Sequence, residues 1–318
     1  MNHGRELTIV MYHYVRSLKK SRYPNIKGLD VSKFRDQLAY LIGNYQPITV
    51  EELVHSIRTG DSLPPKAVML TFDDGYLDHY LNVFPVLYDM GIQGAFFPPV
   101  SPVKDHKLLD VNRIHFILAA ADDIRKVRGD LDSHIESYRD EFQLPSMEEY
   151  WSRYAQQSRF DSAEVIYIKQ MLQHALPEKL RHHIASELFS KYVTFDEETF
   201  ARELYMDADQ LSLMQHNGMY IGAHGVSHCW LNKISLDRKI EEIEDSLVFL
   251  RGIGSPVDDY WVMCFPYGVW DEELLNELRQ RKCGFGLTTE AAVANLDLCD
   301  PLLLPRLDTN DLPGKHYS

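Results

Sequence analysis

The sequence contains no long hydrophobic run: no window approaches the roughly 18 apolar residues that a membrane-spanning helix needs. Ahead of its first apolar segment it also lacks the basic region, apolar stretch and small-residue cleavage site of a signal peptide. Its four cysteines are far apart and include no CxxC pair, so neither a zinc ribbon nor a disulfide framework is indicated. These absences predict a cytoplasmic protein without a membrane span.

The sequence also has fewer basic than acidic residues. The chain has 33 Lys and Arg residues against 47 Asp and Glu residues, which gives a formal net charge of −14. Because the acidic residues are dispersed and repel phosphate groups, nucleic acid and anionic membrane surfaces are disfavoured as partners. The 318 residues contain no low-complexity tract and are enough for one large folded domain or two ordinary ones.

What the sequence does contain is an alternation of strand-like and helix-like segments. Apolar runs predict strands within residues 7–12, 66–75, 92–100, 218–225, 260–268 and 283–289. Helical spacing predicts helices at residues 30–45, 76–90, 235–251 and 271–281, and a further helix after a short strand within residues 47–60. Ser32 and Thr49 are the expected N-caps of the first two helices. Strands that alternate with helices indicate an α/β fold with mainly parallel strands.

A long helical segment interrupts this alternation. From about residue 101 to residue 215 the sequence has almost only helical periodicity, broken by short polar stretches. We therefore predict an α/β domain formed by residues 1–100 and 205–318, with residues 101–204 as a helical insertion or lid. A lid would suit a small substrate, because it excludes water from the site.

Two adjacent carboxylates, Asp73 and Asp74, follow the strand in "AVMLTFDDGY", and Gly75 allows a sharp turn there. The carboxyl ends of parallel strands are where α/β folds place their chemistry. Adjacent side chains at a strand end point in different directions, so one acid could bind a metal while the other acts as a base. The alternative is an acidic turn in which one aspartate caps the next helix.

A histidine pair follows another predicted strand. His224 and His228, in "IGAHGVSH", are four residues apart and could direct two imidazoles at one point. With a carboxylate they would complete a three-ligand set for zinc or a similar divalent metal. Such pairs also occur by chance on surfaces. Two histidines and one aspartate could also form an iron site for oxygen chemistry, in which case turnover would depend on oxygen.

His13 stands at the end of the first strand, in "LTIVMYHYV". Taken alone, it is most simply a hydrogen-bonded histidine of the core or its rim.

Five segments together resemble the polysaccharide deacetylase family, also called the NodB-homology or carbohydrate esterase 4 family. "TFDDGY", "IGAHGVSH" and "CFPYG" resemble its first three motifs, while "MYHYV" and "LPRLD" resemble a branch with an N-terminal Tyr-His strand. The resemblance covers about residues 7–100 and 205–310. It implies a distorted or incomplete (β/α) barrel of the NodB-homology type.

The resemblance also implies roles for individual residues. Asp74, His224 and His228 would hold a divalent metal ion, most commonly Zn²⁺, with Co²⁺, Ni²⁺, Mn²⁺ or Fe²⁺ as alternatives. Asp73 would be the general base that deprotonates the water activated by the metal. The backbone N–H of Tyr267 would stabilise the oxyanion of the tetrahedral intermediate.

The chain departs from the family pattern in two places. Cys264 occupies the position of the third motif's usual arginine, which pairs with the base; we expect Arg306 of "LPRLD" to replace it, although a surface arginine paired with Asp308 is an equal alternative. The leucine-histidine motif expected after residues 302–304, whose histidine protonates the leaving amine, is missing. Because a barrel closes on itself, the first strand could supply this acid, and His13 is our candidate.

These residues predict a metal-dependent amide hydrolase that removes an N-acetyl group from an amino sugar. A cytoplasmic location would favour a sugar precursor, a nucleotide sugar or an oligosaccharide as the substrate. The alternative within the same superfamily is a hydrolase of a non-sugar amide or of a cyclic ureide or imide. A third interpretation is a binding module that holds the metal but has lost catalysis; Asp73 argues against it, while the missing motif arginine leaves it open.

Overall fold

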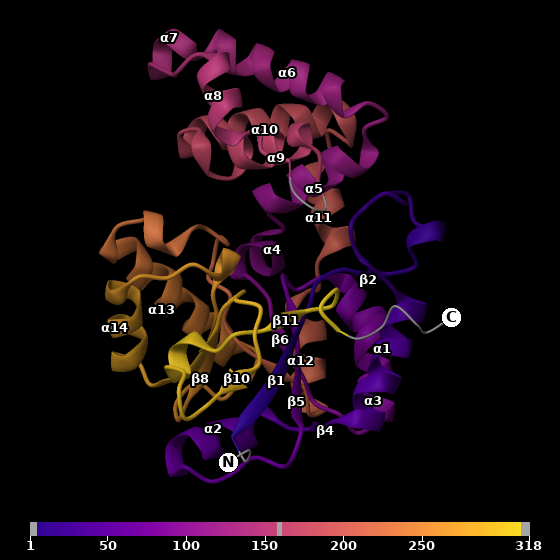
Figure 1. Ribbon diagram of the computed structural model, residues 1–318, viewed down its shortest axis with the longest axis vertical. Helices are drawn as coiled ribbons and strands as arrows, with labels where there is room; N and C mark the ends of the chain where they lie inside the picture. Colours follow the sequence, from indigo (N-terminus) through magenta and orange to yellow (C-terminus); the bar gives the residue numbers. More distant parts are fainter. Residues whose placement is uncertain (1–4, 158–160, 313–318) are drawn as a thin grey trace. The chain divides into compact units, whose positions relative to one another are not determined.

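The computed structural model of the chain describes residues 5–157 and 161–312 (Figure 1). It divides into two compact units, which we describe separately. The first unit comprises Met1–Ser17, Gly28–Lys107 and Arg202–Ser318, and the second comprises Leu18–Lys27 and Leu108–Ala201. Leu18–Lys27 lies outside the predicted insertion of residues 101–204, because this segment is far from the other residues of its unit along the chain.

The first unit is built on a seven-stranded sheet with the order β10-β1-β5-β6-β7. Four of these strands form parallel ladders: β1 (Glu6–Tyr12), β5 (Ala67–Asp73), β6 (Gly94–Phe97) and β7 (Tyr220–Ile221). The other three are short: β4 (Gln46–Pro47) pairs with the start of β5, β10 (Ala294–Asn295) with the start of β1 and β11 (Leu307–Asp308) with the end of β1. The mainly parallel sheet agrees with the predicted fold class.

Two further strands nearly close the sheet into a barrel. β8 (Trp261–Cys264) and β9 (Cys283–Leu287) form a parallel pair of their own. A single bridge joins Ala223, just after β7, to Met263 in β8, and another joins Leu287 in β9 to Leu304. Leu304 lies just before β11, which pairs with β1. The circuit therefore depends on isolated bridges rather than full ladders, as expected for an incomplete barrel.

Helices and short turns complete the first unit (Figure 1). A two-stranded pair, β2 (Val15–Arg16) and β3 (Leu29–Asp30), precedes them. The helices and helical turns of this unit are α1 (Val31–Asn44), α2 (Val50–Thr59), η2 (His79–Val83), α3 (Phe84–Asp89), α4 (Val100–Asp105), α12 (Ala208–His216), η4 (Leu231–Lys233), α13 (Leu236–Gly252), η5 (Pro266–Gly268), α14 (Glu272–Gln280) and η6 (Pro301–Leu303).

Alternation along β5 decides which side chains reach the inside of the barrel. Val68, Leu70 and Phe72 pack in one buried cluster with residues of α1, α3, α12, α13 and α14. Met69 belongs to a second cluster, formed with inward residues of β1, β6, β8 and β9 and with α2. Because side chains of a strand alternate between its two faces, Thr71 and Asp73 share the inner face with Met69. The strand thereby delivers Asp73 to the interior.

Two local expectations from the sequence need correction. Asp30, not Ser32, caps α1: the Asp30 side chain accepts a hydrogen bond from the Ser32 N–H. The single helix expected over residues 76–90 is a π-helical turn, η2, followed by the shorter α3. Pro85 has no N–H for a regular α-helical bond, which accounts for the irregular start. The Thr49 cap is confirmed, as part of a capping box with Glu52.

The second unit is helical, as its periodicity predicts. Its elements are η1 (Leu18–Lys20), α5 (Asp110–Ala120), α6 (Ile124–Ser137), α7 (Arg139–Phe142), α8 (Met147–Tyr154), α9 (Ala163–Gln170), the π-helical turn η3 (Met171–Ala175), α10 (Glu178–Tyr192) and most of α11 (Glu197–Leu204). No helix in the described parts of either unit is both long and apolar enough to cross a membrane.

Ion pairs around Arg113 connect three helices of this unit. The buried Arg113 of α5 donates hydrogen bonds to both carboxylate oxygens of Glu197 in α11 and to Asp110 in its own helix. Asp110 also contacts His182 of α10, with 3.0 Å between Oδ1 and Nδ1. The hydrogen bond that His182 donates to Asp110 raises the pKa of His182, so folding favours the protonated imidazole.

This contact predicts a stability difference with pH. A raised pKa in the folded state stabilises the fold fully below the unfolded pKa of about 6.5, and the effect is lost as pH rises through the folded value. The pair is partly exposed, so we expect it to contribute about 0.2–1 kcal/mol. In urea unfolding, His182→Gln should remove the difference in the free energy of unfolding between about pH 6 and pH 8 that this ion pair causes. His183→Gln, whose imidazole contacts Tyr138 instead of a carboxylate, is the matched control; equal effects of both changes would contradict the prediction.

Candidate active site

The two aspartates lie at the end of β5 and point in different directions. Asp73 is the last residue of the strand, and Asp74 follows it with a left-handed backbone, at φ 70°. Gly75 is also left-handed, at φ 66°, and a Cβ atom there would lie 2.7 Å from the Pro98 Cβ. Only glycine fits this turn, which separates the two carboxylates.

The two histidines meet Asp74 from the segment that follows β7. The Oδ1 atom of Asp74 lies 3.4 Å from Nε2 of His224 and 3.3 Å from Nε2 of His228. The other ring nitrogen of His224, Nδ1, is 2.7 Å from the Cys264 carbonyl oxygen. An imidazole that donates from Nδ1 to a carbonyl keeps the lone pair of Nε2 available to a ligand.

These three residues fit a divalent metal ion. Their ligand atoms lie within 4.8 Å of one another, and all three residues are buried. Asp74 Oδ1 has no hydrogen-bond partner among the described residues, whereas Oδ2 accepts a bond of 2.6 Å from the Tyr76 hydroxyl. Burial opposes ionisation of Asp74, but the two imidazoles outweigh it and hold its pKa well below the usual range. Two imidazole nitrogens and one carboxylate oxygen are a donor set that zinc accepts.

Asp73 forms a buried ion pair with Arg306. The guanidinium donates two parallel hydrogen bonds, of 2.9 Å to Oδ1 and 2.8 Å to Oδ2. Further bonds to the Thr288 carbonyl and the Thr71 hydroxyl fix Arg306, which is only 1% exposed. Burial alone would raise the pKa of Asp73, but the charge of Arg306 and its hydrogen bonds lower it to about 2. The alternative of a surface arginine paired with Asp308 does not describe this residue.

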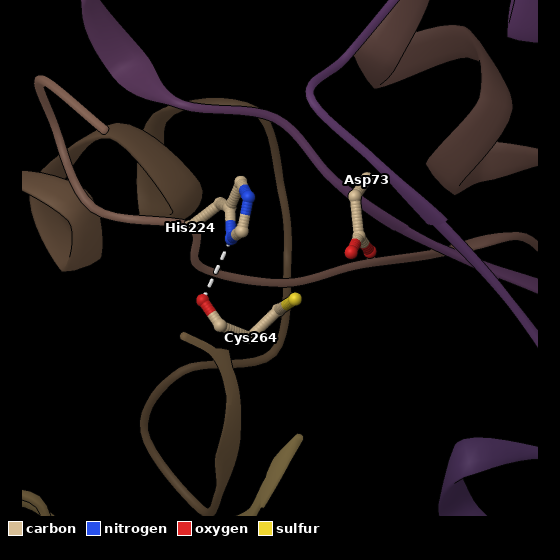
Figure 2. A group of neighbouring side chains, drawn as sticks. All are labelled: Asp73, His224 and Cys264. Carbon is tan, nitrogen blue, oxygen red and sulfur yellow. Dashed lines mark hydrogen bonds between the residues drawn. The ribbon is translucent and has the colours of Figure 1, made fainter. Parts of the chain in front are cut away.

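A second group of possible ligands shares His224 with the first. Figure 2 shows the Asp73 carboxylate and the Cys264 thiol pointing into the same space, beside the His224 ring. Both oxygens of Asp73 are already bonded to the Arg306 guanidinium, and a second cation there would be repelled by its charge. Burial also raises the pKa of the Cys264 thiol, which disfavours the thiolate that metals bind. The first group is therefore the better metal site.

His13 lies at the rim of the same cluster. Its Nε2 atom is 3.9 Å from Asp73 Oδ2, and its side chain is 40% exposed, against 3% for Asp73. The backbone carbonyl of His13 accepts a hydrogen bond of 2.8 Å from Nε2 of His79. The imidazole of His13 thus lies close to the Asp73 carboxylate and is accessible from solvent.

Tyr267 stands beside the histidine pair. Its backbone is left-handed, at φ 57°, within the turn η5 that follows β8. Its ring stacks on Trp230, with centroids 4.7 Å apart, and meets the His228 ring edge-on at 4.7 Å. The aromatic contacts hold this turn against the histidine segment. The role of its backbone N–H stays a prediction from the resemblance.

Sequence reasoning missed two residues that support the site. Tyr76 and His79 follow the two aspartates in the chain, and both are fully buried. Tyr76 holds Asp74, and its ring stacks on Tyr14 with centroids 4.1 Å apart. Burial lowers the pKa of His79 to about 4, so the neutral ring supports the His13 backbone. Tyr76 stands next to the aspartate motif, and this position was the only available signal.

Comparisons with known proteins agree with this geometry. The family model described as polysaccharide deacetylase matches residues 181–285, which include both histidines and Tyr267. A poly-beta-1,6-N-acetyl-D-glucosamine N-deacetylase of Escherichia coli strain K12 is 49% identical over 57 residues, 18% of this chain and 8% of that protein. The chain thus matches less than a tenth of that relative's length.

Two solved structures share the fold over nearly the whole chain. The deacetylase PplD of Streptococcus pyogenes, in complex with acetate, has a TM-score of 0.55 at 15% identity and covers 95% of this chain and 92% of that one. IcaB from Ammonifex degensii has a TM-score of 0.55 at 18% identity and covers 96% and 92%.

The fold is that of solved deacetylases with the NodB-homology fold, and the possible metal ligands Asp74, His224 and His228 lie beyond the ends of its strands. Within this fold, the likeness to the polysaccharide deacetylase family rests on the match of residues 181–285 to the family model and on the short segment shared with the named deacetylase. The predicted resemblance is therefore confirmed.

Proposed function

We propose that this protein is a metal-dependent hydrolase that removes the N-acetyl group from an amino sugar. The observation that carries the proposal is the buried, unpartnered Oδ1 of Asp74 between His224 and His228, next to an Asp73 carboxylate fixed by an arginine. A divalent metal ion bound there, Zn²⁺ by its donor set, would polarise the amide carbonyl and lower the pKa of water.

The chain's own residues then divide the proton transfers. Asp73 is ionised at neutral pH and accepts the proton of the attacking water, while Arg306 fixes the orientation of its carboxylate. The oxygen adds to the carbonyl carbon, and the backbone N–H of Tyr267 stabilises the resulting oxyanion. When the C–N bond breaks, His13 donates a proton to the departing amine. The products are acetate and the free amino sugar.

Arg306 also supports an enzyme over a binding module that lost catalysis. The sequence left this alternative open because Cys264 replaces the motif arginine. The Arg306 guanidinium makes the contact to the base that the missing arginine would make, with bonds to both oxygens of Asp73. A module without catalysis would have no need of this costly buried ion pair.

The test is a screen for acetate release. Substrates are N-acetylated sugars, nucleotide sugars, chitooligosaccharides and β-1,6-linked oligosaccharides of N-acetylglucosamine, the last because of the named relative. The predicted cytoplasmic location favours the soluble precursors among them. Acetate release from none of these, with carboxylate release from a non-sugar amide or a cyclic ureide, would contradict the sugar substrate and favour the alternative.

Chelation should remove the activity reversibly. We expect acetate release to fall to background after dialysis against a chelator, and to return on addition of about one equivalent of Zn²⁺. His228→Ala should lower metal content and turnover together, because it removes one of three ligands. His216→Ala, on the surface of α12, is the control. Full activity in the chelated protein would contradict the proposed metal dependence.

A further inference from the structure

The loop between the two histidines, residues 225–227, is held from one side by a buried glutamate. Glu242 of α13 accepts the backbone N–H of Val226 at 2.5 Å and that of Ser227 at 3.1 Å, both on Oε2. Its other oxygen, Oε1, accepts the Ser227 hydroxyl at 2.5 Å. A single carboxylate that is only 7% exposed thus pairs with three donors of the loop.

The opposite side of the loop is held by the beginning of α4. The N–H of Val100 donates to the Gly225 carbonyl at 3.2 Å, and the N–H of Ser101 donates to the Val226 carbonyl at 2.9 Å. These donors belong to the first turn of α4, where backbone N–H groups have no partner inside the helix. The loop is therefore fixed by hydrogen bonds that it donates to Glu242 of α13 and by hydrogen bonds that it accepts from the N–H groups of α4.

The sequence of the loop is adapted to the glutamate. Gly225 has φ 70°, and a Cβ atom at this position would lie 2.9 Å from Oε2 of Glu242. A side chain at residue 225 would therefore press on the same oxygen that receives both N–H groups. Glycine allows the carboxylate to lie against the backbone.

His228 needs this support. Its backbone has φ 54°, a left-handed conformation that costs a residue with a side chain about 1–2 kcal/mol. Its Nδ1 atom is buried without a hydrogen-bond partner among residues 5–157 and 161–312, so no bond of its own ring fixes its direction. Beyond its edge-on contacts with the His224 and Tyr267 rings, the direction of Nε2 towards Asp74 thus depends on the backbone that leads to it.

We propose that Glu242 is a positioning residue for the metal site: it holds the loop so that His224 and His228 direct their Nε2 atoms at one point. The inference rests on the proposed function, because the metal is its readout. The side chain of Glu242 bonds to Val226 and Ser227 and not to the ring nitrogens of the two histidines. Its effect should therefore be on metal affinity.

The test measures Zn²⁺ affinity of the full chain by competition with a chromophoric chelator. Glu242→Leu leaves three donors without their acceptor and should weaken Zn²⁺ binding by about 10–100-fold. Glu242→Gln should bind within about threefold of the unchanged protein, because its amide oxygen can accept both N–H groups while its NH₂ donates to the Ser227 hydroxyl. Rescue by this isosteric, uncharged variant would show that geometry, not charge, is what the residue supplies.

Two further variants keep the result interpretable. Glu242→Asp retains the charge but withdraws the carboxylate by one C–C bond; it should weaken binding by about tenfold even if Glu242→Leu fails to fold. Glu241→Leu changes the exposed neighbour on α13 and should leave the affinity unchanged. Unchanged affinity in Glu242→Asp, or an equal loss in Glu241→Leu, would overturn the inference. If the unchanged chain binds no divalent metal, the proposed function fails together with the inference. If it binds the metal but the Glu242 variants bind it equally well, only the inference fails.

Discussion

Replacing Arg306 by alanine should lower turnover by about 10²–10⁴-fold and the free energy of unfolding by about 3–5 kcal/mol. The change leaves Asp73 ionised and buried without the cation that compensates it, so the carboxylate loses both its orientation and its partner. Urea unfolding and acetate release measure the two effects. Arg279→Ala, which breaks an exposed pair with Asp300, should have little effect on either.

A second change should restore part of the loss. The Cys264 sulfur and a carboxylate oxygen of Asp73 lie within 4.8 Å of each other, and an arginine at residue 264 could reach Asp73 through the space that Arg306 leaves. Cys264→Arg should therefore be harmful alone, because the core is already filled, and beneficial in the Arg306→Ala background. Normal turnover in Arg306→Ala, or purely additive effects of the two changes, would contradict a shared contact with the base.

Replacing His13 by asparagine should lower acetate release from an N-acetyl sugar by about 10²–10⁴-fold, with bound metal unchanged. The amine leaving group needs a proton, and His13 is the imidazole at the rim of the cluster that could supply it. Its side chain is 40% exposed, so the melting temperature should change little. Zinc content, melting temperature and turnover are measured on the same preparation.

The leaving group offers a sharper readout for His13. The aryloxide of an activated aryl acetate departs without protonation, so hydrolysis of this ester should suffer far less in His13→Asn than hydrolysis of the amide. His55→Asn, an exposed imidazole paired with Asp61, is the control. A near-normal rate with the amide would remove His13 from the mechanism, and an equal loss with both substrates would assign it a role other than proton donation.

The parts of the site that the sequence could predict are those at the ends of strands. Asp73 and Asp74 follow a buried strand, and so do the histidines, and parallel strands bring their carboxyl ends together whatever their separation in the chain. The same rule placed His13 near them. Arg306 could only be suggested, because its partner depends on how residues 304–308 close the barrel.

The supporting residues could not be predicted in the same way. The carboxylate of Glu242 is on the buried side of α13, a place where periodicity predicts an apolar residue, and nothing in its neighbours indicates a loop for it to hold. The burial of His79 could not be predicted either, because the π-helical turn that contains it has no recognisable sequence pattern. Leu18–Lys27 belongs to the second unit through contacts with residues that are distant in the sequence, so its sequence gives no sign of them.

The pairing of β1 with β11 has a consequence for the synthesis of the protein. The proposed proton donor follows β1, near the start of the sequence, and the arginine that holds the base immediately precedes β11, near its end. A nascent chain that has formed the preceding helices and most of the sheet still lacks this strand, and with it the arginine that pairs with Asp73. The proposed activity should therefore be absent until residues 306–308 have been synthesised and β11 has paired with β1, and a chain shortened before residue 306 should fold in part and hydrolyse nothing.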